Sequence, residues 1–107
     1  MDGETWDQVA ALIGWLDAAN GTADPEPLMR VLKVAEEAGE VASAVIGMVG
    51  QNPRKGRTHT RDDVAAELCD VALTAFVALA SYADDPRATW EAHVAKVAAR
   101  ALGPSRS

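Results

Sequence analysis

The sequence predicts an all-α fold, organised as a single domain over residues 1–107. Three observations predict it. Hydrophobic residues make up 49% of the chain and recur at the spacing of helix faces rather than in strict alternation. Alanine, the strongest helix former, is abundant, whereas aromatic residues are few. Glycine, proline and asparagine divide the apolar runs into four segments, so we expect four helices and no strand.

The first helix is expected over residues 6–19. Thr5 with Gln8 fits a capping box at its start, and Asn20-Gly21 fits a stop signal at its end. Its apolar face is formed by residues three or four apart: Trp6, Val9, Ile13 and Leu16.

The second helix is expected over residues 25–49, with Asp24 as its N-cap and Gly50 as its stop. Two glycines lie inside it, and each costs about 1 kcal/mol of helix stability relative to alanine. They are Gly39 and Gly47. We expect Gly39 to permit a close approach of another backbone segment.

Residues 51–61 form a polar, basic stretch that is typical of a loop. The third helix is expected from about residue 62 to 83, and Thr60 with Asp63 resembles a capping box.

The fourth helix follows the breaker Asp84-Asp85-Pro86 and ends at Gly103-Pro104. Beyond Pro104 we expect a frayed tail. The apolar face of this helix contains Trp90, Val94, Val97 and Ala101.

The formal net charge of −6 argues against non-specific binding to nucleic acid, which needs a basic surface. A phosphate substrate stays possible, because a bound divalent cation reverses the local charge. Cys69 is the single cysteine, so no internal disulfide forms. No secretory signal precedes the first helix, and the most apolar run, residues 64–83, contains Glu67 and Asp70. We therefore expect a cytoplasmic protein with no membrane segment.

Five acidic residues lie in stretches that are otherwise apolar or small: Glu36, Glu37, Glu40, Glu67 and Asp70. Such helices are usually buried, and neither stretch holds a lysine or arginine to pair with the acids. At about 100° per residue, the first three acids share an arc of about 100° and the other two an arc of about 60°. Two helices packed side by side would therefore direct all five carboxylates to one point.

Unpaired carboxylates in such a cluster repel one another, by roughly 3 kcal/mol for two of them 5 Å apart at an effective dielectric of 20. A divalent cation removes this repulsion, and oxygen-only ligands favour Mg²⁺, with Mn²⁺ as a substitute. A solvated acidic helix face is the simpler alternative for any single pair of acids. The apolar surroundings and the missing bases favour the metal site.

These residues also resemble a known signature. The run Glu36-Glu37-Ala38-Gly39-Glu40, followed by Glu67-Leu68-Cys69-Asp70, resembles the E-E-x-x-E…E-x-x-D motif of the MazG-like nucleotide pyrophosphohydrolases. This all-α NTP pyrophosphatase superfamily includes dimeric dUTPases and phosphoribosyl-ATP pyrophosphohydrolases. The resemblance covers residues 28–83. It implies a four-helix MazG-like bundle assembled as a homodimer or homotetramer, and Mg²⁺-dependent cleavage of nucleoside triphosphates between the α and β phosphates.

The resemblance also implies roles for individual residues. The metal ligands would be Glu37, Glu40, Glu67 and Asp70. Glu36 and Glu37 would be catalytic, with Glu36 binding a second metal ion or orienting the attacking water. Phosphate contacts would come from Lys33, Lys55 and Arg100, and Trp15 would stack on the base. Trp6 and Trp90 are expected in the core, and His59 and His93 receive no role.

Two other functions stay open at this stage. A phosphoribosyl-ATP pyrophosphohydrolase-like enzyme would share the metal chemistry but have a different organic pocket. An inactive nucleotide-binding or helical interaction module would need no catalysis, although an inactive relative would be expected to have lost at least one of the five acids.

Overall fold

A computed structural model describes residues 1–103, and this range contains four α-helices and no strand. They are α1 (Gly3–Asn20), α2 (Glu26–Val49), α3 (Arg61–Leu79) and α4 (Pro86–Leu102). The all-α prediction is confirmed. Within the described range no helix has the length and apolar character needed to cross a membrane. Pro104 and the predicted tail lie outside the described residues.

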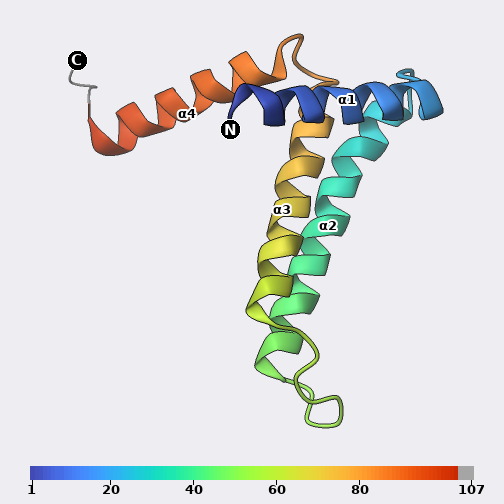
Figure 1. The fold of residues 1–107 in the computed structure, drawn as a ribbon, viewed down its shortest axis with the longest axis vertical. Helices are drawn as coiled ribbons and strands as arrows, with labels where there is room; N and C mark the ends of the chain where they lie inside the picture. Colours follow the sequence, from blue (N-terminus) through green and yellow to red (C-terminus); the bar gives the residue numbers. More distant parts are fainter. Residues whose placement is uncertain (104–107) are drawn as a thin grey trace.

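The helices form an open arrangement rather than a closed bundle (Figure 1). α2 and α3 run antiparallel, side by side, and are joined at one end by the basic loop. α1 lies across the other end of this pair, and α4 extends away from it. The radius of gyration is 17.2 Å, against about 13 Å for a compact domain of this length. The single chain therefore does not by itself build the predicted four-helix bundle.

The predicted start of α1 and two predicted N-caps were wrong, whereas α2 begins within one residue of its predicted start. α1 begins three residues early because the Asp2 carboxylate accepts a hydrogen bond from the Thr5 backbone N–H at 2.9 Å, so Asp2 is the cap and Thr5 is inside the helix. α2 is preceded by Pro25 and has no side-chain cap, so Asp24 does not serve as one. The Glu26 N–H instead donates to the Ala23 carbonyl at 3.0 Å, and this turn leads into the helix.

Several other cap and stop signals are confirmed. Thr60 and Asp63 form a capping box at the start of α3, and the Asp85 carboxylate caps α4. Three glycines that end helices have positive φ values, which only glycine adopts without strain: Gly21, Gly50 and Gly103. α3 ends at Leu79, four residues earlier than predicted, because turn hydrogen bonds replace the helical pattern after it.

The core is small and lies where α1 crosses the helix pair. Trp6 is buried and packs edge-to-face on Phe76, with ring centroids 5.2 Å apart. Phe76 contacts Trp90 of α4 in the same way, at 5.1 Å. Such aromatic pairs add stability beyond the area they bury. The predicted core position is confirmed for Trp6, whereas Trp90 contacts Phe76 but is 38% exposed, so its prediction as a core residue was wrong.

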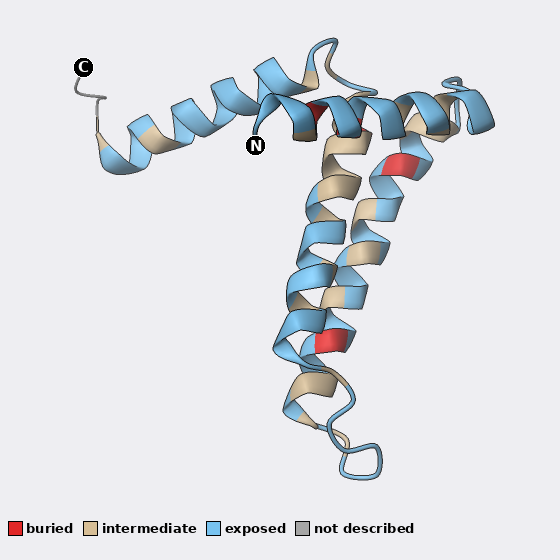
Figure 2. Cartoon of the chain, in the orientation of Figure 1, coloured by how far each residue is buried: buried red, intermediate tan, exposed pale blue. Residues whose placement is uncertain are grey.

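The prediction that both acid-bearing helices are buried is not met within one chain. Most of α2 and α3 is exposed (Figure 2), and Leu32 and Leu68 are 60% and 53% accessible. Each helix is covered on one side only, where Ala44 and Ala78 are buried and small enough for close packing. The apolar residues on the remaining sides have no partner in the described part of the chain.

The close backbone approach predicted at Gly39 occurs at Gly47 instead. The Thr58 backbone N–H donates to the Gly47 carbonyl at 2.9 Å, which holds the end of the loop against α2. A Cβ atom on Gly47 would overlap the side chains of Thr58 and His59, whereas a Cβ atom on Gly39 would meet nothing within 4 Å.

Candidate functional site

Three of the predicted acids converge between α2 and α3. Glu37, Glu67 and Asp70 each offer a carboxylate oxygen, and these oxygens lie within 4.8 Å of one another. We call this group the acid cluster. Glu67 and Asp70 are three residues apart and share a face of α3, and antiparallel packing brings Glu37 of α2 opposite them. Glu37 and Glu67 are half-buried, and Asp70 is exposed.

The acid cluster carries uncompensated negative charge. Partial burial raises the pKa of Glu67, and the charges of Asp70, Glu40 and Glu37 raise it further. Glu40 thus lies close enough to act on Glu67, although its oxygens are not among the three that converge. A carboxyl whose charge is disfavoured in this way gains from a bound cation.

The geometry and donor set fit Mg²⁺ or Mn²⁺. Oxygen ligands lie about 2.1 Å from Mg²⁺, so adjacent ligands of one ion are about 3 Å apart and opposite ligands about 4 Å apart. Carboxylate oxygens within 4.8 Å of one another reach that spacing by small side-chain rotations. Cys69 is exposed and outside the group, so the ligands are all oxygens, which disfavours zinc.

Glu36 does not join the three converging acids. It forms an exposed ion pair with Lys33, and this bond raises the pKa of Lys33. The expectation that all the acids lack a basic partner was therefore wrong for Glu36. The pairing lysine lies just before the apolar stretch, one turn away on the same helix.

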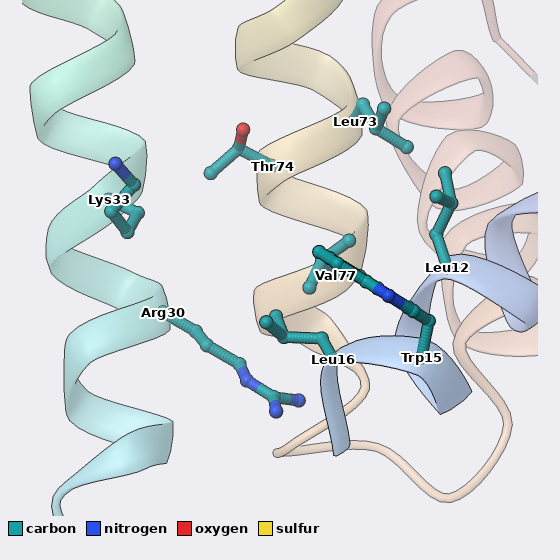
Figure 3. Close-up of a pocket in the computed structure, with 8 residues that line it drawn as sticks. All are labelled: Leu12, Trp15, Leu16, Arg30, Lys33, Leu73, Thr74 and Val77. Atoms are coloured by element: carbon teal, nitrogen blue, oxygen red, sulfur yellow. The ribbon is translucent and has the colours of Figure 1, made fainter. Parts of the chain in front are cut away.

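An apolar pocket of about 230 Å³ opens where α1 meets the helix pair (Figure 3). Trp15 and Lys33 both line it, and Trp15 is the most exposed of the three tryptophans, at 69% against 38% for Trp90 and 7% for Trp6. The full lining is Leu12, Trp15, Leu16, Arg30, Lys33, Leu73, Thr74 and Val77. The structure thus brings together two predicted substrate residues from different helices.

Arg30, which sequence reasoning missed, fixes one wall of this apolar pocket. Its side chain is only 5% exposed. It donates to the Asp17 carboxylate at 2.7 Å and to the Glu26 carboxylate at 2.9 Å, and so ties α1 to α2. The spacing of Arg30 four residues after Glu26 was a readable signal, but the contact with Asp17 depends on the helix crossing.

A second pocket, of about 310 Å³, lies between the basic loop and α2, and we call it the loop pocket. Lys55 lines it, as the sequence suggested for a phosphate contact. The full lining is Ser43, Ile46, Gly47, Gln51, Asn52, Lys55, Gly56, Thr58 and His59. Arg100 is not brought to either pocket, because it lies on α4, which extends away from the pair.

The two pockets flank the acidic residues along α2. Lys33 of the apolar pocket precedes Glu37 by four residues, and Ser43 of the loop pocket follows Glu40 by three. At about 1.5 Å per residue, these separations along the helix are about 6 Å and 4.5 Å.

No family model, no curated protein and no solved structure matches this chain. The chemistry of the site therefore rests on the acid cluster, its charge and the two pockets beside it.

Proposed function

We propose that this protein is a Mg²⁺-dependent nucleoside triphosphate pyrophosphohydrolase that converts (d)NTPs to monophosphates and pyrophosphate. The observation that carries the proposal is the convergence of Glu37, Glu67 and Asp70 from two helices, with charge that needs a cation. The apolar pocket and the loop pocket on either side suit the two ends of a nucleotide. The resemblance of the acid motifs to those of MazG-like enzymes supports the same reading.

In this proposal the acid cluster holds the cation and Glu40 adds negative charge beside it. When bound, Mg²⁺ supplies polarisation of the phosphate oxygens and makes a nearby water more acidic. Glu36, which pairs with Lys33 outside the acid cluster, would bind a second metal ion or orient the attacking water and accept its proton. The water oxygen bonds to the α-phosphorus, and the bond from the α-phosphorus to the bridging oxygen breaks, so that pyrophosphate leaves.

The nucleoside is proposed to occupy the apolar pocket. The exposed ring of Trp15 offers a face on which a base stacks. Lys33, which lines the same pocket and pairs with Glu36, would contact phosphate. Lys55 contacts the phosphate tail from the loop pocket. Arg100 reaches phosphate only if a second copy of the chain presents its α4 at this site.

We also propose that the active form is a homodimer or homotetramer. The chain exposes 7806 Å², whereas a compact protein of 11.2 kDa exposes about 5,700 Å². The excess, about 2,000 Å², is what one subunit of an obligate oligomer buries. Apolar residues account for part of it along α2, and Leu28, Val31, Leu32 and Val49 are all exposed there. A second helix pair on these faces would complete the predicted bundle.

The test is pyrophosphate release from a panel of canonical and modified NTPs and dNTPs, with Mg²⁺, Mn²⁺ or EDTA. Wild type is compared with Glu37→Ala and with Glu91→Gln, a control acid on α4 that pairs with Arg87. Release that needs metal, is lost in Glu37→Ala and is kept in Glu91→Gln supports the proposal.

Two outcomes would replace it. Release from phosphoribosyl-ATP alone would favour the related enzyme with a different organic pocket. No release from any substrate, with the protein folded and metal bound, would overturn the enzymatic proposal and favour a nucleotide-binding or interaction module.

A further inference from the structure

We propose that the loop pocket binds the β,γ-diphosphate of the substrate and retains the pyrophosphate product, through Ser43 and Thr58 in addition to Lys55. We infer further that residue 47 is glycine so that this pocket can form. The identity of the ligand rests on the proposed function, whereas the pocket and its binding of a diphosphate anion can be tested without catalysis.

The loop is held against α2 at two glycines. The Thr58 N–H donates to the Gly47 carbonyl, and the Thr58 hydroxyl bonds to His59 Nδ1 at 2.9 Å. A Cβ atom on Gly47 would overlap both of these side chains, and one on Gly50 would lie 2.9 Å from Arg57 Cγ. Since Gly47 has ordinary helical geometry, its missing side chain serves the approach of the loop rather than an unusual backbone angle.

The lining of the pocket suits an anion. None of its nine residues is an aspartate or glutamate, and Lys55 supplies a positive charge. Ser43 and Thr58 supply hydroxyl donors, and Asn52 supplies an amide. The Asn52 side chain also accepts a hydrogen bond from the Arg54 N–H at 3.0 Å, which fixes the turn that carries Lys55. A phosphate tail accepts such hydrogen bonds, and those from a charged donor are the stronger ones.

The position of the pocket matches the length of the ligand. Glu36, Glu40, Ser43 and Gly47 follow one another at intervals of four, three and four residues, so they form one stripe along α2. Ser43 and Gly47 lie about 4.5 and 10.5 Å beyond Glu40 along the helix axis. If the α-phosphate lies at the acid cluster, the β and γ phosphates extend along α2 toward the loop pocket. The nucleoside then extends in the opposite direction, toward Trp15 in the apolar pocket.

A matched pair of glycine substitutions tests this assignment. Gly47→Ala and Gly39→Ala make the same chemical change in the interior of the same helix, and each raises helix propensity. Only the methyl group at position 47 meets the loop. Titration calorimetry would measure binding of inorganic pyrophosphate, and separately of AMP, to the Mg²⁺-loaded protein. Ser43→Ala is a third variant, which removes one donor without moving the loop.

We expect Gly47→Ala to weaken pyrophosphate binding about tenfold or more, the loss expected for a displaced charge-assisted hydrogen bond. Ser43→Ala is expected to weaken it about threefold to tenfold, and Gly39→Ala to leave it unchanged. AMP binding should stay the same in all three variants. Equal pyrophosphate affinity in wild type, Gly47→Ala and Ser43→Ala would overturn the assignment, as would equal weakening in Gly47→Ala and Gly39→Ala.

The outcome is separable from that of the hydrolase proposal. Pyrophosphate binding that is lost in Gly47→Ala, in a protein that hydrolyses no NTP, would support the loop pocket and overturn the enzyme. Hydrolysis that is intact, with pyrophosphate affinity untouched by Gly47→Ala and Ser43→Ala, would overturn the loop pocket and leave the enzyme standing.

Discussion

α2 carries acidic residues in two places, and their surroundings differ: one has a basic partner and the other has acidic neighbours. At its start, Glu26 shares the buried guanidinium of Arg30 with Asp17 of α1. The hydrogen bond from Arg30, assisted by one from Asn20, holds the pKa of Glu26 below its ordinary value. About three turns further on, the neighbours of Glu37 are acids, and partial burial together with those acids raises the pKa of Glu67.

This difference separates a structural charge group from a functional one. Arg30, Asp17 and Glu26 form what we call the Arg30 group, in which both carboxylates are bonded to a positive charge of the same chain, and this group fastens α1 to α2. The acid cluster has no such basic partner, and partial burial and the neighbouring acids disfavour the charge of Glu67. In the proposed function, a bound cation balances this charge. The same helix thus contributes Glu26 to a group with a basic partner and Glu37 to a cluster of acids.

The largest expected effect is on catalysis. Glu37→Gln keeps the shape of the side chain but removes one anionic ligand from the acid cluster, so we expect kcat/KM to fall at least about a hundredfold, because metal-ion charge stabilisation is worth several kcal/mol. Glu26→Gln, in the Arg30 group, should keep kcat/KM within about threefold at a temperature where both proteins are folded. Similar losses in both variants would remove the distinction between the two groups.

The next effect is on stability in the presence of metal. Mg²⁺ at a hundred times its dissociation constant should raise the free energy of unfolding of wild type by about 2.7 kcal/mol. Glu67→Gln should gain much less from Mg²⁺, yet be more stable than wild type in EDTA because one repelling charge is gone. Thermal unfolding with Mg²⁺ and with EDTA checks the direction of both changes in stability. A Glu67→Gln protein that is less stable than wild type in EDTA would contradict the expected charge repulsion in the acid cluster.

Arg30→Met should lower the free energy of unfolding by about 2 kcal/mol, because it removes charged hydrogen bonds and leaves Asp17 and Glu26 without their partner. Lys33→Met is the matched control, since Lys33 is an exposed partner of Glu36 and such pairs contribute little. Urea denaturation measures the free energy of unfolding of both variants. Equal losses in Arg30→Met and Lys33→Met would show that burial of the ion pairs of Arg30 adds no stability.

The smallest effect is on pH dependence. Since the folded-state pKa of Glu26 lies below its ordinary value of about 4.3, its contribution to stability is present above that pH and is lost as pH falls through the folded-state pKa. Arg30→Met should therefore lose less stability than wild type on acidification below about pH 4. The midpoints of urea unfolding of both proteins, measured across this pH range, would show the difference. An equal loss of stability with falling pH in wild type and Arg30→Met would argue against the pairing of Arg30 with Glu26.

The sequence was informative wherever the determinants are local. The Thr60–Asp63 capping box and the Asp85 cap depend on residues three apart, and both were predicted. Helical periodicity was enough to bring Glu67 and Asp70 onto one face, whereas the metal that the missing bases suggested stays a prediction. The cap of α1 was misassigned because Asp2 and Thr5 are both suitable N-cap residues. The Thr5 backbone N–H donates to the Asp2 carboxylate, so Asp2 is the cap.

What sequence reasoning missed depends on contacts between distant segments. The burial of Arg30 requires α1 to cross α2, and the role of Gly47 requires the loop to return to the helix. Glu40 was predicted to converge with the other acids from its helical arc, and to be a ligand from the resemblance, yet the three converging oxygens come from Glu37, Glu67 and Asp70. The expected burial of both helices failed because their outer faces have no partner among residues 1–103.

Metal binding is the most direct test of whether the acid cluster is a site for a divalent cation. Mn²⁺ titration followed by electron paramagnetic resonance would compare wild type, Asp70→Asn and Glu26→Gln, with Mg²⁺ as a competitor. The account predicts that wild type and Glu26→Gln bind Mn²⁺ equally, that Mg²⁺ displaces it, and that Asp70→Asn binds it at least about tenfold more weakly. No binding to wild type, or equal affinity in Asp70→Asn, would contradict the claim that the acid cluster is a site for a divalent cation.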